Sequence, residues 1–292
     1  MTITRQGLLQ LGSTVFPVED VTLDPALATQ ARASSGDEFP TAQTVFGGVP
    51  TIQCSMPVDN ALDDIGLTVL KVTTLELSLL NIDSSTGKTA SGTSHPRISL
   101  ATSCSAYVLV NSISASQGAL ATAQVTIFGI SNDGDTDPFE VGTGAALALA
   151  SQPTLHTMGP VDINGSEISG ATGINGSLNH DAGPRTTDGD LYPSQFSWRG
   201  CNPVMNIEHS NPAGVLSSLG LDGASITSAT KVTLRERAAT GVISSTEKSI
   251  TIGAGYILTN AISGGVGRTA STGMTILPAS SDGTTHPWTL GT

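Results

Sequence analysis

Hydrophobic and polar residues alternate along much of the chain, with the period of two that is typical of half-buried β-strands. Within residues 68–82, the leucines at 75, 77 and 79 alternate with Glu76 and Ser78. Turns built from Gly, Asn-Asp-Gly and Ser-Asp-Gly separate such runs. The pattern predicts a protein that is mainly all-β. Similar runs rich in Val, Ile, Leu and Thr occupy residues 106–114, 123–131, 231–237, 255–263 and 273–280.

The same pattern occurs twice. Residues 111–141 and 260–290 align without a gap, and twelve of the 31 positions are identical, where about three are expected by chance. Two upstream blocks repeat in the same order: GDEFPTAQ (36–43) as GDLYPSQF (189–196), and ALDDIGL (61–67) as VLSSLGL (215–221). We therefore interpret the chain as a tandem duplication. The predicted domains are residues 1–145 and 155–292, with the boundary near 143–157.

Each half also contains one candidate helix. In NPAGVLSSLG, Asn211 is suited to cap the helix, Pro212 to occupy its first turn, and Gly220 to end it. The matching segment of the first half begins at Asp59 or Asn60 and ends at Gly66. Two leucines three apart in the second segment (216 and 219), and Leu62 with Ile65 in the first, predict one apolar face per helix. Each unit is thus expected to be a β-sandwich or barrel with one short helix. The Gly-rich residues 161–190 are expected to form a long loop.

Composition narrows the possible functions. The formal net charge is −12, and only four residues are lysines, so the chain lacks the clustered bases with which proteins grip nucleic acid. The hydrophobic fraction is 38%, and the longest smooth apolar run, 145–150, is too short to span a bilayer. The first 16 residues do not resemble a secretion signal. We expect a protein that is neither secreted by a standard signal nor inserted in a membrane.

Candidate chemistry is sparse. Asp133, Asp135 and Asp137 are spaced like calcium ligands, but Pro138 stands where a calcium loop needs glycine, and the second copy keeps only Asp282. A turn explains both copies better than a metal site.

Other reactive residues are scattered. The three cysteines form no CxxC pair, so we expect reduced thiols and no zinc site; the histidines do not form a metal-binding or catalytic motif. The sequence therefore predicts no enzyme, no cofactor, and no catalytic or metal-binding residue. The cysteines are Cys54, Cys104 and Cys201, and the histidines are His95, His156, His180, His209 and His286.

Each half runs as a proline-rich segment, a Gly-Asp-aromatic-Pro step, a strand, a short helix, long strands and a terminal hairpin with an Asp-Gly turn. This order resembles the major tail tube proteins of long-tailed (siphovirus-like) bacteriophages, in particular the tandem-duplicated type. The resemblance covers most of the chain and rests on architecture rather than on a diagnostic motif. It implies tail-tube β domains, and homotrimeric rings with pseudo-sixfold symmetry that stack into a tube.

The resemblance also implies partners and a location. DNA would pass through the lumen without specific binding, and the other partners would be the tape measure, tail terminator and distal tail proteins. The protein would be assembled in the cytoplasm of the host bacterium and reside in the tail of the virion. Because acidic walls repel phosphate, we expect Asp and Glu to dominate the inner wall.

Other functions fit the same sequence. The chain could be a distal tail or baseplate hub component, or a capsid decoration protein. It could also be a carbohydrate-binding surface module, although only 4% of its residues are aromatic.

Overall fold

The computed structural model describes residues 3–32, 39, 42–58, 62–82, 86, 89, 94–149, 154–237, 243–265 and 268–291, and the structural statements below concern these residues. Strands predominate, and two short helices accompany them: α1 (Leu62–Ile65) in the first half and α2 (Pro212–Leu219) in the second. The predictions of a mainly all-β protein and of one short helix per half are therefore confirmed.

Most strands of the first half have a counterpart in the second half. In the first half the strands are β1 (Ile3–Leu11), β2 (Thr14–Asp24), β3 (Ala28–Arg32), β4 (Ala42–Gly47), β5 (Thr51–Pro57), β6 (Leu70–Val72), β7 (Leu75–Ile82), β8 (His95–Leu100), β9 (Ser105–Ser116), β10 (Thr122–Ile130) and β11 (Phe139–Gly144). In the second half they are β12 (Leu155–Ile163), β13 (Ser166–Ile168), β14 (Ala171–Ser177), β15 (His180–Arg185), β16 (Gln195–Cys201), β17 (Val204–His209), β18 (Ala224–Ser225), β19 (Thr230–Arg237), β20 (Ile243–Ile252), β21 (Gly255–Gly265), β22 (Arg268–Pro278) and β23 (Trp288–Gly291).

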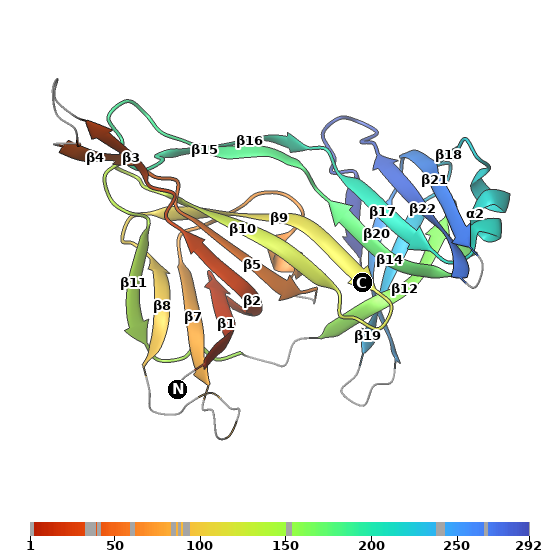
Figure 1. Ribbon diagram of the computed structural model, residues 1–292, viewed down its shortest axis with the longest axis horizontal. Coiled ribbons are helices and arrows are strands. Elements are labelled where there is room, and N and C mark those ends of the chain that lie inside the picture. The colour runs from red at the N-terminus through yellow and green to blue at the C-terminus, as the bar shows by residue number, and fades with distance from the viewer. Residues whose placement is uncertain are drawn as a thin grey trace.

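One sheet runs through both halves of the molecule (Figure 1), and we call it the junction sheet. Its strand order is β2-β5-β10-β9-β14-β17-β22-β21-β18, and β6 also pairs with β9. Strands β11-β8-β7-β1 form the first flanking sheet, which continues into the junction sheet through β2. The second flanking sheet has the order β13-β12-β19-β20-β23. Two antiparallel hairpins, β3–β4 and β15–β16, project from these sheets (Figure 1).

The two halves have the same strand order. In the junction sheet, β2-β5-β10-β9-β6 of the first half corresponds to β14-β17-β22-β21-β18 of the second. In the flanking sheets, β11-β8-β7-β1 corresponds to β23-β20-β19-β12. Each half is thus a two-layered sandwich of the kind in which the inward faces of two sheets share a core. The division at residues 145 and 155 stays a prediction, since the junction sheet passes from one half to the other without a break.

Alternating side chains build the core. In β10, Val125 and Ile127 are fully buried; in β17, Met205 and Ile207 are fully buried, while the side chains between them point away. Trp288 is the largest fully buried side chain, and its ring lies against Gly176 of β14, where a Cβ would come within 2.7 Å of the indole. A larger residue at 176 would therefore force the two layers of the second half apart.

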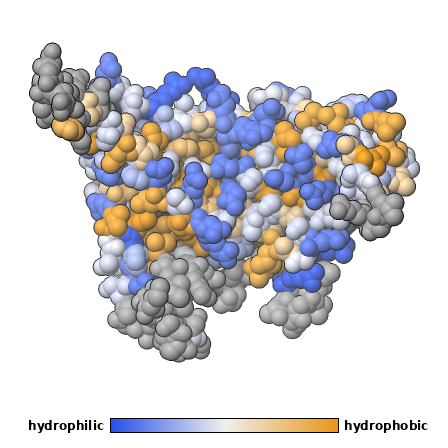
Figure 2. Space-filling view, viewed as in Figure 1, coloured by the Kyte–Doolittle hydropathy of each residue, from blue (hydrophilic) through white to orange (hydrophobic). Residues whose placement is uncertain are grey.

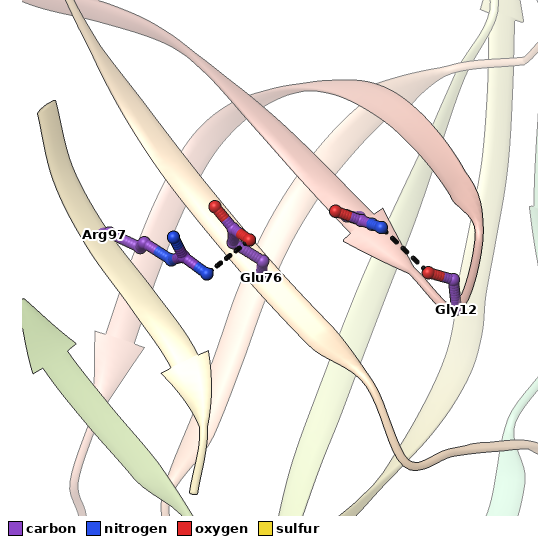
Figure 3. A network of polar contacts seen from close by, with 4 residues as sticks. Gly12, Glu76 and Arg97 are labelled. Carbon is purple, nitrogen blue, oxygen red and sulfur yellow. Dashed lines mark hydrogen bonds and ion pairs between the residues drawn. The ribbon is translucent and has the colours of Figure 1, made fainter. Parts of the chain in front are cut away.

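Strand β7 follows its predicted alternation only in part. Leu75 and Leu77 are buried as predicted, but Ser78 is buried as well. The reason is its central position: β7 lies between β1 and β8, whose side chains cover its outward face. On that face, Arg97 Nη2 of β8 lies 2.6 Å from Glu76 Oε2 (Figure 3). A partly exposed pair of this kind contributes at most about 1 kcal/mol, so it orients the strands more than it stabilises them.

Helix α2 begins and ends where the sequence indicates. The Asn211 side chain accepts a hydrogen bond from the backbone N–H of Gly214, and Gly220 ends the helix with a φ of 69°. The apolar face differs slightly from the prediction, because Val215 and Leu219 are the buried pair. The predicted start of the first helix, at Asp59 or Asn60, lies outside the described residues.

Two local predictions are wrong. Residues 161–190 are not a long loop, because they contain β13, β14 and β15. At Gly176 the missing side chain allows the Trp288 ring to pack closely on β14. The Asp-Gly turn near the end of each half does not close a hairpin either. In the first half β10 pairs with β5 and β9, whereas β11 pairs with β8 in the flanking sheet. The turn therefore carries the chain from one layer to the other, and the aromatic residue after it (Phe139 or Trp288) enters the core.

The turns themselves have the predicted chemistry. The Asp133 carboxylate accepts hydrogen bonds from the backbone of Asp135 and of Thr136 and from the hydroxyls of Thr136 and Ser131, at 2.6–3.0 Å. Asp282 accepts the matching four bonds in the second half. These bonds hold the pKa of both carboxyls well below their usual range, the largest cause being the Ser131 hydroxyl for Asp133 and the Thr285 backbone for Asp282.

We expect these two carboxylates to make the fold acid-sensitive. Since their pKa is depressed in the folded chain, their contribution to stability is present above the pKa of an unfolded Asp, about 4, and is lost as the pH falls below it. The thermal unfolding midpoint of the wild type should fall more steeply between pH 5 and pH 3 than that of a double Asp133→Ala, Asp282→Ala variant. Parallel curves would contradict this assignment.

Candidate assembly interface

The described residues do not bring the candidate reactive groups together. No three His, Cys, Asp or Glu side chains among them could hold a metal ion. The histidines bind the backbone instead: His156 Nδ1 lies 2.7 Å from the Val58 carbonyl oxygen, and His180 Nε2 lies 2.8 Å from that of Val110. His95 and His209 each accept a backbone N–H through Nδ1. These side chains have structural roles.

The cysteines are free thiols, in line with the prediction. Cys54 and Cys104 are buried, and Cys201 is half-buried. Burial raises the pKa of Cys54 to about 12, so this thiol stays protonated at neutral pH. It therefore acts as a small apolar side chain of the core rather than as a nucleophile.

The most specific feature of the molecule is the contact between its halves. Strand β9 of the first half pairs antiparallel with β14 of the second, and Ser114 lies opposite Asn175 in the middle of the register. Backbone bonds extend the contact at both ends: Leu178 N–H donates to the Asn111 carbonyl, and Gln117 N–H to that of Thr172. The junction is therefore a continuous piece of β-sheet.

Along one of its edges, strand β9 pairs with two different strands. Its first part, Ala106–Val108, pairs with β6, and its last part, Ser112–Ser116, pairs with β14. Strand β21 is the counterpart of β9 in the second half. Its first part pairs with β18, but residues 261–265 have no partner on that edge among the described strands. The chain thus repeats the junction strand and leaves its second copy open.

The apolar side chains at the two positions show the same difference. Ile113 of β9 is 0% exposed, whereas its counterpart Ile262 of β21 is 45% exposed. Leu109 is 3% exposed and its counterpart Leu258 is 39% exposed. Because the residue types are the same in both halves, the difference comes from what packs on them. Strand β14 pairs with β9 at Ile113, whereas no described strand pairs with β21 at Ile262 on that edge. In Figure 2 hydrophobic side chains are visible at the end of the molecule that carries β21, β18 and α2, and also over the first half.

A complementary open edge lies at the other end of the junction sheet. Strand β2 is the counterpart of β14. Its Thr22–Asp24 segment pairs with β5 on one side, and no other described strand pairs with it on the other. Its earlier residues, 14–18, pair with β1 of the first flanking sheet. One chain therefore carries a free β14-like edge at one end and a free β9-like edge at the other.

The β15–β16 hairpin, which we call the second arm, strengthens the junction from above (Figure 1). Phe196 stacks on Tyr107 of β9, with ring centroids 4.3 Å apart, and Lys71 lies over the Tyr107 ring at 5.7 Å. Near its tip, the Leu191 and Tyr192 N–H groups both donate to the Gly134 carbonyl, at 2.8 Å each. The Gly48 N–H donates to the Leu191 carbonyl. The second arm therefore fastens the second half to the Asp-Gly turn of the first.

The face of the junction sheet that points away from the core is largely polar and uncharged, apart from apolar side chains near the second arm and their counterparts in the second half. These are Tyr107, Leu109, Phe128, Tyr256, Leu258 and Leu277. Asn111 donates to Thr126 at 2.6 Å, and Asn260 donates to Thr275 at 3.0 Å in the second half. Glu208 is an acid on this face. Exposed amides recur from strand to strand across it: Gln53, Gln124, Asn111, Asn175, Asn206 and Asn260.

Comparison with known proteins gives no relative. No protein-family model matches the chain, and no curated protein matches its sequence. Among the described residues, no helix has the length and apolar character to cross a membrane. The junction and its open counterparts are therefore the features on which a function can be argued.

The sequence repeat pointed to the interface residues without showing their role. Ile113 and Ile262 are an identical pair in the repeat, yet only coordinates separate the covered member from the open one. The repeat puts Ile262 at the same strand position as Ile113, but among the described strands β14 lies beside Ile113 and no strand lies beside residues 261–265 on that edge.

We expect the two isoleucines to differ in what they contribute to the isolated chain. Ile113→Ala should lower the free energy of unfolding by about 2–5 kcal/mol, as for other fully buried large-to-small changes. Ile262→Ala should lower it by about 1 kcal/mol or less, because its side chain is half-exposed. Urea unfolding at low protein concentration measures both, and equal losses would contradict the unequal cover.

Proposed function

We propose that this protein is a structural subunit that assembles head-to-tail into closed rings, and that stacked rings form a bacteriophage tail tube through which DNA is delivered. The observation that carries the proposal is the pair of complementary open edges at opposite ends of the junction sheet. Strand β21 of one copy would receive β2 of the next, in the way that β9 receives β14 within the chain.

The in-chain register predicts the register between copies. Within the chain, Ser112, Ile113 and Ser114 lie opposite Ser177, Gly176 and Asn175. Carried to the counterparts, this pairing sets Ala261 against Asp24, Ile262 against Leu23, and Ser263 against Thr22. The backbone groups of both edges would then be paired, which removes the exposed edges that otherwise invite uncontrolled aggregation.

Ring closure follows from the type of contact. Head-to-tail contacts between unlike surfaces produce rings when the rotation per subunit closes, and open filaments when it does not. Each half of the chain is one module, so a ring contains twice as many modules as chains. If the rotation between copies equals that between the halves, these modules are evenly spaced around the ring. The tail-tube resemblance favours six modules, and hence a homotrimer with pseudo-sixfold symmetry.

The polar face of the junction sheet would then line the channel. We expected Asp and Glu to dominate this wall, but amides and hydroxyls are the more frequent polar groups on the face, and Glu208 is an acid beside them. Uncharged amides do not bind phosphate by releasing counterions, as lysines and arginines do. The net charge of −12 adds a general repulsion of DNA. In this proposal DNA slides past a wall that offers it no strong site.

The remaining partners belong to the same proposal. The ends of a finite tube need capping proteins, so the tail terminator and distal tail proteins would contact the terminal rings, and a tape measure protein would occupy the channel during assembly. Assembly would take place in the host cytoplasm, and the mature location would be the virion tail.

A disulfide between copies tests the register. In a Cys201→Ser background, Thr22→Cys combined with Ser263→Cys should give covalently linked trimers under mild oxidation, since these positions would lie opposite each other. Ser114→Cys with Asn175→Cys is the positive control, because that pair lies within one chain. Thr22→Cys with Val141→Cys, on the distant strand β11, should not cross-link. Absence of the first product in the presence of the control product would sink the proposed pairing.

A charge on the open edge tests assembly itself. Ile262→Lys should leave the isolated chain folded, because the side chain is half-exposed, but should abolish rings and tubes in electron micrographs of the concentrated protein. Val141→Lys is the matched control: Val141 is exposed and apolar, yet four strands away from the open edge of β2. Normal rings from the Ile262→Lys variant, or compact monomers from the wild type, would contradict the proposal.

A further inference from the structure

We propose that the β3–β4 hairpin of one copy, here called the first arm, docks on the second half of a neighbouring copy. The inference rests on the proposed ring and names a second contact surface within it. The first arm is the counterpart of the second arm, since β3 and β4 occupy the same place in the first half as β15 and β16 in the second. The second arm has its docking surface within the chain. The described part of the first arm meets the second half at Leu191, next to Gly47 and Gly48, and leaves Phe39 and Val45 exposed.

The surface to which the second arm binds has an open copy in the second half. In the first half, Tyr107 and Phe128 lie against the Phe196 ring, with the Phe128 and Phe196 centroids 5.7 Å apart. Their counterparts are Tyr256 of β21 and Leu277 of β22, which are 38% and 40% exposed. Two large apolar side chains are thus adjacent and uncovered, at the site where the first half holds an aromatic ring.

The turn that holds the second arm is also repeated without its partner. Over Gly134, the side chain of Asp190 from the second arm fills the space where a Cβ would stand. Over Gly283, its counterpart, no other part of the described chain comes within 4 Å of that point. The Gly283 carbonyl is therefore the matching acceptor for an arriving arm.

The first arm carries exposed apolar groups of its own, although Gln43 stands where the second arm has Phe196. Phe39, the counterpart of Tyr192, is 76% exposed, and Val45, the counterpart of Trp198, is 48% exposed. Figure 1 shows β3 and β4 projecting from the end of the molecule that is farthest from α2. Where β4 ends, Gly47 and Gly48 lie against Leu191 of the second arm, but the open surface of β21 and β22 is at the other end of the molecule. The first arm is therefore far from that surface of its own chain and next to the open β2 edge, where the second half of another copy would be.

Two residues differ together between the second-arm contact within the chain and the proposed first-arm contact between copies. In the chain, the Tyr192 hydroxyl donates to Asp137 Oδ2 at 3.5 Å. At the proposed contact, Phe39 takes the place of Tyr192, and His286 takes that of Asp137. The donor and its acceptor are lost together, and the His286 ring is already engaged with Trp288 through Nδ1. An apolar ring at 39 is thus paired with a surface that has lost its carboxylate.

A thiol cross-linker of about 8 Å tests the contact, a length set by the side chains that it must replace. In the Cys201→Ser background, Phe39→Cys combined with His286→Cys should give products between chains when treated with a short bis-maleimide. Tyr192→Cys with Asp137→Cys should react within one chain and is the positive control. The disulfide between positions 22 and 263, formed in parallel, reports whether the ring itself exists.

The two readouts separate the two proposals. Both products together support the ring and the docking of the first arm. The 22–263 disulfide without the 39–286 product leaves the ring and overturns the arm docking. Loss of both products overturns the ring, and with it this inference.

A truncation measures how much the first arm contributes. Phe39→Ala should raise the protein concentration needed for half-maximal assembly by about tenfold or more, the usual effect of removing a buried aromatic anchor from an interface. The thermal unfolding midpoint of the isolated chain should not change, because Phe39 is exposed there. Tyr192→Ala should do the reverse, lowering that midpoint. Assembly of Phe39→Ala at the wild-type concentration would overturn the proposal.

Discussion

The pairing of β9 with β14 is the interaction on which the rest of the structure depends. A strand at the end of a sheet exposes a row of backbone N–H and C=O groups that must be bonded to water or to another strand. In this chain the first half resolves the problem with the second: β14 bonds β9, buries Ile113 and continues the core into the next sandwich. The second arm adds further contacts between the halves, but the pairing of β9 with β14 is what joins them into one continuous sheet.

The duplication makes the chain its own reference. Equivalent positions of the two halves hold the same residue, but in the first half a neighbouring segment covers it and in the second half none of the described segments does. Ile113 and Ile262, Leu109 and Leu258, and Gly134 and Gly283 are such comparisons, and each shows the first half covered where the second is open. A monomeric surface rarely leaves several large apolar side chains uncovered side by side, unless a partner covers them.

Much of the fold could be predicted from the sequence, because local signals carry it. The alternation of β7, the caps of α2 and the turns at Asp133 and Asp282 depend on residues within a few positions of one another. The errors arose where long-range contacts decide. Residues 161–190 looked like a loop because glycines and turn residues dominate them, but those glycines serve close packing, with Gly176 under the Trp288 ring. The Asp-Gly turns looked like hairpins because nothing local tells whether the next strand joins the same layer. The candidate interface could not be predicted for the same reason. The exposure of its residues depends on whether another strand pairs with the edge, as β14 does with β9, and the local sequence does not show this.

The covalent link between the halves also restricts the geometries open to an assembly. Because every copy brings one closed junction and one pair of open edges, any ring built through this pairing counts its modules in twos. Rings with an odd number of modules are excluded by connectivity alone, however favourable their curvature would be. Gene fusion of this kind would therefore prevent rings of five or seven modules, which would change the diameter of a channel, without any additional contact between subunits.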